Sequence, residues 1–200
     1  MKLYVTFTSP YARLARIVVL EKGLQARVEV IAAQTRMTDS PYYAINPSGR
    51  VPYLIDDDGI GWEDSQLICA FLDGLDGKPR LHPESSDWAS RRLEARARSL
   101  CDGIAVWARE MARPVSERSP GVLAHEVARV RRMADVFETE AATPPMQGAL
   151  GMPQLVLAAA LEMARDRHLG DLTEGRPRLA AWLAVMSNLP AMRATAPPRR

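Results

Sequence analysis

The stretch Lys2-Leu-Tyr-Val-Thr-Phe-Thr-Ser-Pro-Tyr11 decides how this chain folds. From Lys2 to Phe7 the residues alternate in the manner of a half-buried strand. Ser9 then stands at the N-cap position of a helix and Pro10 at its first position, a pairing typical of helix starts. Because glycine readily follows a last helical turn, we expect this helix to end near Gly23.

The segment that follows continues to alternate strands and helices. We expect a second strand at Arg27–Ile31 and a short helix at Pro41–Ile45. A hairpin of two strands, Tyr53–Ile55 and Ile60–Trp62, follows, and Asp64-Ser65 begins a further helix. The apolar residues of that last helix follow the 3.6-residue period, and they are Leu67, Ile68, Phe71, Leu72 and Leu75. The predicted order is β-α-β-α-β-β-α.

A stretch rich in Gly and Pro, from Gly74 to Pro83, is expected to link two domains. Beyond it no strand is indicated. The segment Trp88–Arg113 is predicted to be a helix with one apolar stripe, formed by Leu93, Ala97, Leu100, Ile104 and Trp107. With Val122–Ala141, Leu155–Arg167 and Pro177–Ser187, four helices are predicted in all. We expect the third of these to be the buried centre, and the tail after Pro190 to pack back. The sequence thus predicts a mixed α/β domain over residues 1–76 and an all-α helical domain over 84–200.

Composition excludes several classes of protein. A formal net charge of +2, with 47% hydrophobic and 25% charged residues, argues against a nucleic-acid scaffold. The amino-terminal residues do not resemble a signal peptide, and no apolar run approaches the roughly 20 residues that span a bilayer, so we expect a cytoplasmic protein with no membrane contact. Cys69 and Cys101 are far apart and without metal-ligand spacing, which predicts buried thiols and no metal site.

Three motifs in order resemble the N-terminal domain of glutathione transferases: strand-Thr8-Ser9-Pro10-Tyr11-helix, Asn46-Pro-x-Gly-x-Val-Pro52, and Asp64-Ser65 opening a helix. The closing Leu189-Pro-x-Met-x-Ala-Thr-x-Pro197 is similar to bacterial members of that superfamily. The resemblance implies a thioredoxin-like domain followed by a helical one. It also implies glutathione as co-substrate with no further cofactor, a small electrophile as second substrate, and a homodimer.

Ser9 is the residue that the resemblance points to as catalytic. Stabilising a thiolate enough to lower a pKa of about 8.5 to about 6.5 requires roughly 2.7 kcal/mol. A hydroxyl hydrogen bond contributes about 1.5–3 kcal/mol and a helix N-terminus about 0.3–2, so the two together suffice. A plain N-cap is the alternative for Ser9, and Tyr4 and Thr8 are competing hydroxyls. Since Ser9-Pro10-Tyr11-Ala12 holds no sulfur, dithiol exchange through this loop is excluded.

Glutathione itself should meet two further segments. The resemblance implies a cis bond at Val51-Pro52, whose backbone would pair with the cysteinyl part of the tripeptide as a short strand. At the start of the later helix, Ser65 should bind the α-carboxylate of the γ-glutamyl end and Asp64 its ammonium. An ordinary loop proline and an ordinary helix cap are the respective alternatives.

Other site residues are weaker candidates. Arg36 and Arg50 are placed to meet the glycyl carboxylate, although solvated arginines are common. Asp102 is a candidate to reach the same ammonium across a dimer. We expect Tyr11, Ile104 and Trp107 to line the second-substrate pocket, with simple core packing as the alternative for the apolar residues.

The predicted activity is conjugation of the glutathione thiolate to an electrophilic, largely apolar small molecule, in detoxification. Two rivals stay open: another glutathione-dependent reaction, such as that of a peroxidase, isomerase or dehalogenase, and a non-catalytic binding module. One departure from the family is Gly151-Met-Pro-Gln154, where a Ser or Thr followed by Asp normally caps the buried helix. Gln154 is expected to reach back to this helix start, at some loss of stability.

Overall fold

Two compact units make up the computed structural model, which describes residues 1–75, 80–84 and 86–198. The first unit is Met1–His82 with Pro190–Arg200, and the second is Pro83–Leu189. The predicted boundaries, 1–76 and 84–200, had placed the C-terminal segment with the helices. It groups instead with the first unit, because the buried Arg13 donates hydrogen bonds to Met192 and Thr195. Part of the predicted linker, residues 76–79, lies outside the described residues.

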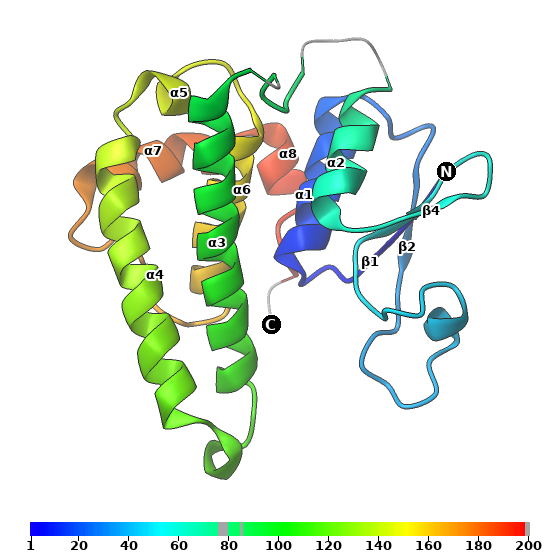
Figure 1. Ribbon diagram of the computed structural model, residues 1–200, viewed down its shortest axis with the longest axis horizontal. Coiled ribbons are helices and arrows are strands. Elements are labelled where there is room, and N and C mark those ends of the chain that lie inside the picture. Colours follow the sequence, from blue (N-terminus) through cyan, green and yellow to red (C-terminus); the bar gives the residue numbers. More distant parts are fainter. Residues whose placement is uncertain (76–79, 85, 199–200) are drawn as a thin grey trace. The chain divides into compact units, whose positions relative to one another are not determined.

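The first unit is built on a four-stranded sheet in the order β2-β1-β3-β4. Its elements in chain order are β1 (Lys2–Val5), α1 (Pro10–Glu21), β2 (Glu29–Ala32), the 3-10 helix η1 (Pro41–Ala44), β3 (Tyr53–Ile55), β4 (Gly61–Trp62), α2 (Ser65–Asp73) and the late α8 (Pro190–Ala194). β1 runs parallel to β2 and antiparallel to β3, and β3 is antiparallel to β4. Figure 1 shows α1 and α2 side by side on this sheet. This arrangement confirms the predicted thioredoxin-like domain.

The second unit is helical. It contains α3 (Trp88–Met111), the 3-10 helix η2 (Val115–Glu117), α4 (Pro120–Glu140), α5 (Pro144–Gln147), α6 (Met152–Asp166) and α7 (Pro177–Ser187). The predicted stripe of α3 is buried, and α6 is enclosed over most of its length, as expected of a central helix. A Cβ at Gly103 would lie 2.9 Å from Val130 Cγ1, so the glycine lets α3 and α4 approach closely.

Some details differ from the sequence-based expectations. The short α5 was not predicted. In α2 only part of the apolar pattern faces the core: Ile68 and Leu72 are fully buried, whereas Leu67 is 49% exposed. Gly151 caps α6 without a side-chain hydrogen bond, as expected. Gln154 does not reach back, however, because its amide donates to the carbonyls of Pro145 and Ala149 at 3.0 and 2.8 Å.

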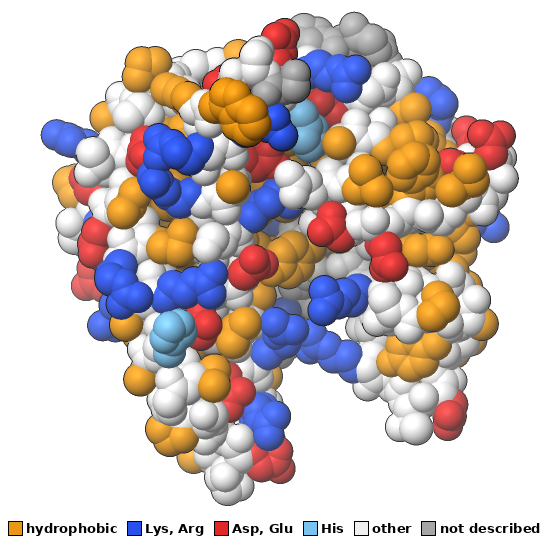
Figure 2. Space-filling view, in the orientation of Figure 1, with side chains coloured by type: hydrophobic (Ala, Val, Ile, Leu, Met, Phe, Trp, Pro, Cys, Tyr) orange, Lys and Arg blue, Asp and Glu red, His pale blue; other side chains and the backbone are white. Residues whose placement is uncertain are grey.

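An apolar patch covers the outer side of α2 and β4. Leu67 and Ile60 are exposed, and the rings of Trp62 and Phe71 stack with centroids 4.4 Å apart. Hydrophobic side chains gather over this part of the first unit (Figure 2). We call these four residues the α2–β4 patch.

Candidate functional site

Ser9 begins α1, as predicted. Its backbone is extended, with φ −83° and ψ 125°, and its Oγ accepts a hydrogen bond from the amide of Ala12 at 3.3 Å. Ser9 is half-buried, and Pro10 occupies the first turn. Because Oγ uses a lone pair on Ala12, the hydroxyl proton is a separate donor for an anion. The electropositive helix terminus adds to the attraction for such an anion.

The strand register brings the three predicted glutathione-binding segments to one end of the sheet. Tyr4 pairs with Tyr53 across the antiparallel strands β1 and β3. Because the two strands are antiparallel, the end of β1, which leads to Ser9, lies at the same end of the sheet as the start of β3, which follows Val51-Pro52. The amide of Ser9 donates to the carbonyl of Thr6 at 3.1 Å. Pairing of β3 with β4 sets the start of α2 at the same end.

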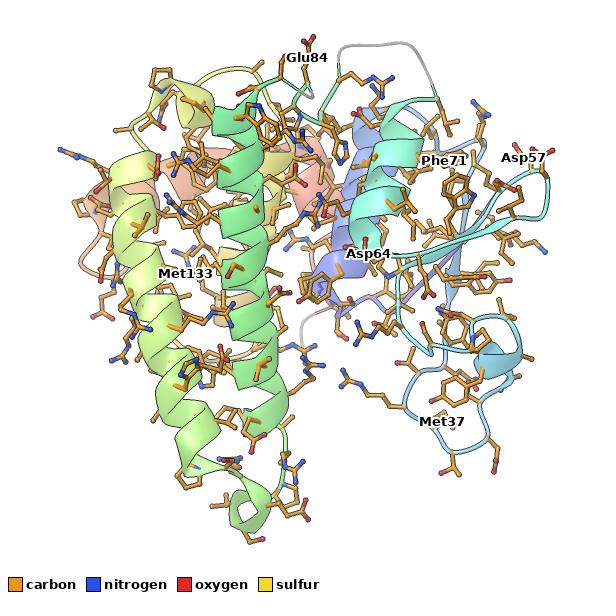
Figure 3. All side chains as sticks on the ribbon, in the orientation of Figure 1. Met37, Asp57, Asp64, Phe71, Glu84 and Met133 are labelled. Atoms are coloured by element: carbon orange, nitrogen blue, oxygen red, sulfur yellow. The ribbon has the colours of Figure 1, made fainter. Side chains whose placement is uncertain are left out.

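Figure 3 shows this arrangement through its labelled residues. Asp64 lies at the start of α2, whereas Asp57 lies in the hairpin turn at the opposite end of β3 and β4. Leu54 pairs with Trp62 in the antiparallel strands β3 and β4. The end of β4, which Asp64 follows, therefore lies next to the start of β3, which Val51 precedes. Ser9, Val51 and Asp64 therefore lie at the same end of the sheet in the first unit.

The peptide bond between Val51 and Pro52 is cis, which confirms the expectation from the resemblance. The turn before it is held by its own residues. Gly49 has a φ of +64°, and a Cβ there would lie 2.8 Å from Tyr43 Cε1, so this turn requires glycine. The carbonyl of Arg50 accepts hydrogen bonds from the hydroxyl of Tyr42 and from Asn46 Nδ2.

Asp64 and Ser65 form the N-terminus of α2. Asp64 is the N-cap, and its Oδ1 accepts from the amides of Gln66 and Leu67 at 2.9 and 3.4 Å. Ser65 is the first helical residue and is buried. The peptide bond that joins Glu63 to Asp64 is also cis. The capping role of Asp64 is thus shown. Its carboxylate, which attracts cations, is exposed at a helix N-terminus, which attracts anions.

The remaining predicted residues are dispersed. Arg36, with φ 62°, and Arg50 are both exposed in loops of the first unit. Tyr11 lies half-buried on α1. Ile104 and Trp107 lie on α3 of the helical unit and are 0% and 9% exposed. Their assignment to a second-substrate pocket stays a prediction, as does the role of the two arginines.

Tyr4 was the competing hydroxyl that the sequence left open. It lies on β1 with its ring 5.8 Å from that of Tyr42. Burial raises the pKa of the Tyr42 hydroxyl, with a smaller opposite effect of its hydrogen bond to Asn46, so it remains a proton donor to the Arg50 carbonyl. Tyr4 thus packs against Tyr42 on a strand, whereas Ser9 stands at a helix terminus, and the choice of Ser9 over Tyr4 stays a prediction.

Sequence reasoning missed several supporting residues. Tyr42, Asn46, Ser48 and Glu63 surround the turn that leads to Val51. Asn46 bonds residues only four positions away, whereas the bonded Ser48 and Glu63 are 15 positions apart. Within the turn motif, Asn46 was the one available signal, because asparagine often bonds nearby backbone groups.

Thiols and metal-binding side chains form no second site in the part of the chain that the structure describes. Cys69 and Cys101 are both buried, which confirms that expectation. Over residues 1–75, 80–84 and 86–198, three or more His, Cys, Asp or Glu residues nowhere gather as a metal ion would need. Nor does any helix in these ranges have the length and apolar character to cross a membrane.

Comparison with known proteins settles the family. The model of the glutathione S-transferase N-terminal domain matches residues 8–75, and that of the C-terminal domain matches residues 106–184. The uncharacterized GST-like protein YibF of Escherichia coli is 32% identical over 140 residues, covering 69% of this chain and 68% of that one. This chain belongs to the glutathione S-transferase superfamily.

Solved structures of superfamily members are similar over the whole chain. A glutathione transferase family member from Pseudomonas fluorescens Pf-5, with bound glutathione, superposes with a TM-score of 0.91 at 28% identity and covers 98% of both chains. A glutathione S-transferase from Methylobacillus flagellatus with glutathione bound gives 0.85 at 27% identity, covering 98% of this chain and 99% of that one. Glutathione S-transferase Z2 of Arabidopsis thaliana is 35% identical over half of this chain and 44% of its own length.

For this superfamily member, the N-terminal match contains Ser9, Val51, Asp64 and Ser65. These are the residues that the register gathers at one edge of the sheet. Of the two predicted α3 pocket residues, Trp107 falls within the C-terminal match and Ile104 precedes it.

Proposed function

We propose that this protein binds glutathione and conjugates its thiolate to a small, largely apolar electrophile, with Ser9 as the catalytic residue. The observation that carries the proposal is the position of the Ser9 hydroxyl at the N-terminus of α1, at the same end of the sheet as the cis Val51-Pro52 segment. Related structures with bound glutathione support the choice of co-substrate.

Each part of glutathione has a counterpart at this edge. The cysteinyl backbone pairs with Val51, and its sulfur lies against the Ser9 hydroxyl. The γ-glutamyl α-carboxylate accepts from the amide and hydroxyl of Ser65, while its ammonium meets Asp64. Arg36 and Arg50 are the candidates for the glycyl carboxylate, since both are exposed in loops of the same unit.

The chemistry is thiolate stabilisation followed by attack on the electrophile. The Ser9 hydroxyl donates to the sulfur anion and the helix terminus attracts it. Together they supply about the 2.7 kcal/mol that a roughly hundredfold larger ratio of thiolate to thiol requires. The thiol proton leaves to solvent. The new carbon–sulfur bond forms as a leaving group departs from the electrophile or, in an addition, as the double bond of the electrophile opens. No metal or prosthetic group takes part in this reaction.

Ultraviolet titration of enzyme-bound glutathione tests the assignment. The wild type should show a thiolate band at neutral pH, Ser9→Ala should lose it, and Ser9→Thr, which keeps a hydroxyl, should retain most of it. A band that persists in Ser9→Ala would remove Ser9 from the mechanism. Binding of glutathione without turnover of any electrophile in a substrate panel would favour a binding module. Turnover confined to peroxides would favour a peroxidase, and turnover confined to halogenated organic compounds would favour a dehalogenase.

We further propose that the protein is a cytoplasmic homodimer that acts in detoxification. The α2–β4 patch supports a partner, because contiguous exposed apolar side chains mark interaction sites. Multi-angle light scattering should give twice the monomer mass for the wild type. Leu67→Glu should shift it toward the monomer, whereas Gln66→Glu adds the same charge at the neighbouring position and should not.

A further inference from the structure

A hydrogen bond joins the turn before Val51 to the residue before Asp64. Ser48 Oγ donates to Glu63 Oε2 at 2.8 Å. The same Oγ accepts from the amide of Arg50 at 3.3 Å, so one hydroxyl links the turn to itself and to the approach of α2. We call this Ser48–Glu63 contact the latch.

The turn is fixed on its other side as well. Asn46 Oδ1 accepts from the amide of Ser48 at 3.0 Å, and Asn46 Nδ2 donates to the Arg50 carbonyl at 3.0 Å. Asn46 is 1% exposed and Tyr42 is 3% exposed, so this side of the turn is anchored in the interior. Ser48 and Glu63 are exposed, which makes the latch the outer support of the same turn.

The two partners adjoin the two segments that hold glutathione. Three residues beyond Ser48 stands Val51, and directly after Glu63 stands Asp64, the N-cap of α2. We propose that the latch sets the spacing between Val51 and Asp64-Ser65, which makes Glu63 and Ser48 positioning residues for glutathione. This inference rests on the proposed function.

The physical reason is preorganisation. In the proposed complex glutathione contacts both Val51 and Asp64-Ser65, so the conformational freedom of one segment relative to the other is lost on binding. A hydrogen bond that already restricts them lowers this cost, and a single bond of this kind contributes about a threefold to tenfold change in affinity. Glu63 acts through its oxygen as an acceptor, so its negative charge is not what the role requires.

The test measures glutathione dissociation constants by isothermal titration calorimetry. Glu63→Ala and Ser48→Ala should each weaken binding roughly threefold to tenfold, and the double variant no more than either alone, because both remove one bond. Glu63→Gln should bind like the wild type, because its amide oxygen still accepts from Ser48. Glu29→Ala, which removes an exposed carboxylate on β2, should have no effect. In turnover, the KM for glutathione should rise while kcat at saturation and the KM for the electrophile stay constant.

Several results would overturn the inference. If Glu63→Gln is as weak as Glu63→Ala while Ser48→Ala binds normally, Glu63 contacts the ligand by its charge and the latch is irrelevant. Equal affinities for all variants refute it outright. A wild type that does not bind glutathione refutes the proposed function itself, a result distinct from any difference between variants. Should Glu63→Ala unfold, Ser48→Ala and Glu63→Gln decide the matter, since both are conservative at exposed positions.

Discussion

Arg13 Nη2 donates to the main-chain carbonyl of Met192 at 2.9 Å, and the two residues are 179 positions apart in the chain. Arg13 Nε also donates to Thr195 Oγ1 at 3.3 Å, and Arg16 Nη1 donates to the Thr195 carbonyl at 3.2 Å. The last helix thus completes the first unit by polar contacts with the helix that Ser9 begins. Its place in the fold follows from these bonds.

Arg13→Met should therefore destabilise the protein by about 2 kcal/mol, because hydrogen bonds from a charged donor are lost while the apolar stem is kept. Urea unfolding gives the free energy of unfolding. Arg27→Met is the matched control on an exposed arginine, with an expected change within about 0.5 kcal/mol. Equal stability of the two variants would show that the contact of α8 with Arg13 contributes nothing.

Asp73 makes the stability of the first unit depend on pH. Its carboxylate accepts hydrogen bonds from the amides of Leu81 and His82, each at 3.0 Å, and lies 3.2 Å from Lys22 Nζ. Burial by itself would raise the pKa of Asp73, but these hydrogen bonds outweigh burial and hold the pKa below its ordinary value.

A carboxyl whose pKa is lowered by folding stabilises the protein above its unfolded pKa, about 3.9, and loses this contribution as the pH falls through the folded value. Asp73→Asn should cost about 3–5 kcal/mol at neutral pH, because it breaks the buried ion pair with Lys22. The difference from the wild type should shrink below about pH 4. Asp58→Asn, in the exposed hairpin turn, is the control. A pH-independent difference would contradict the assigned role of the carboxylate.

Asp64 allows its two roles to be separated. Asparagine caps helices about as well as aspartate, so Asp64→Asn should leave the melting temperature unchanged. It removes the charge that we propose to face the ammonium of glutathione, so the dissociation constant should rise roughly tenfold. Asp64→Ala should lose both stability and affinity. Calorimetric titration measures the affinity for glutathione and thermal melting measures the stability. Unchanged affinity in Asp64→Asn would show that Asp64 acts only as a helix cap.

At the start of α6, restoring the usual Ser and Asp of the family's cap is expected to have opposite effects at the two positions. Gly151 is extended, at φ −151° and ψ 176°, so Gly151→Ser should stabilise the helix by a few tenths of a kcal/mol, about 1 °C in melting temperature. Adding Gln154→Asp should reverse the gain, because the amide donors to Pro145 and Ala149 are lost. A double variant that melts higher than Gly151→Ser would show that the capping box outweighs those bonds.

Local patterns predicted much of this fold. Ser9-Pro10 located the start of α1, Asp64 the start of α2, and the apolar stripe of α3 its buried face, because caps and helical periodicity depend on neighbours in the sequence. Periodicity failed at Leu67, which has helical spacing but lies on the outer side of α2. Which apolar face is covered depends on the elements packed against the helix, and these are distant in sequence.

The sequence by itself determined the order of strands and helices, the family, and the residues Ser9, Val51, Asp64 and Ser65 as candidates for the site. Only the tertiary structure decided how they are held together. The pairing of β1 with β3 gathers them at one edge, Asn46, Ser48 and Glu63 support the turn between them, and Arg13 ties α8 to the first unit. Apart from the local bond of Asn46 to Arg50, these contacts join residues that are distant in sequence, and no local rule of spacing encodes them.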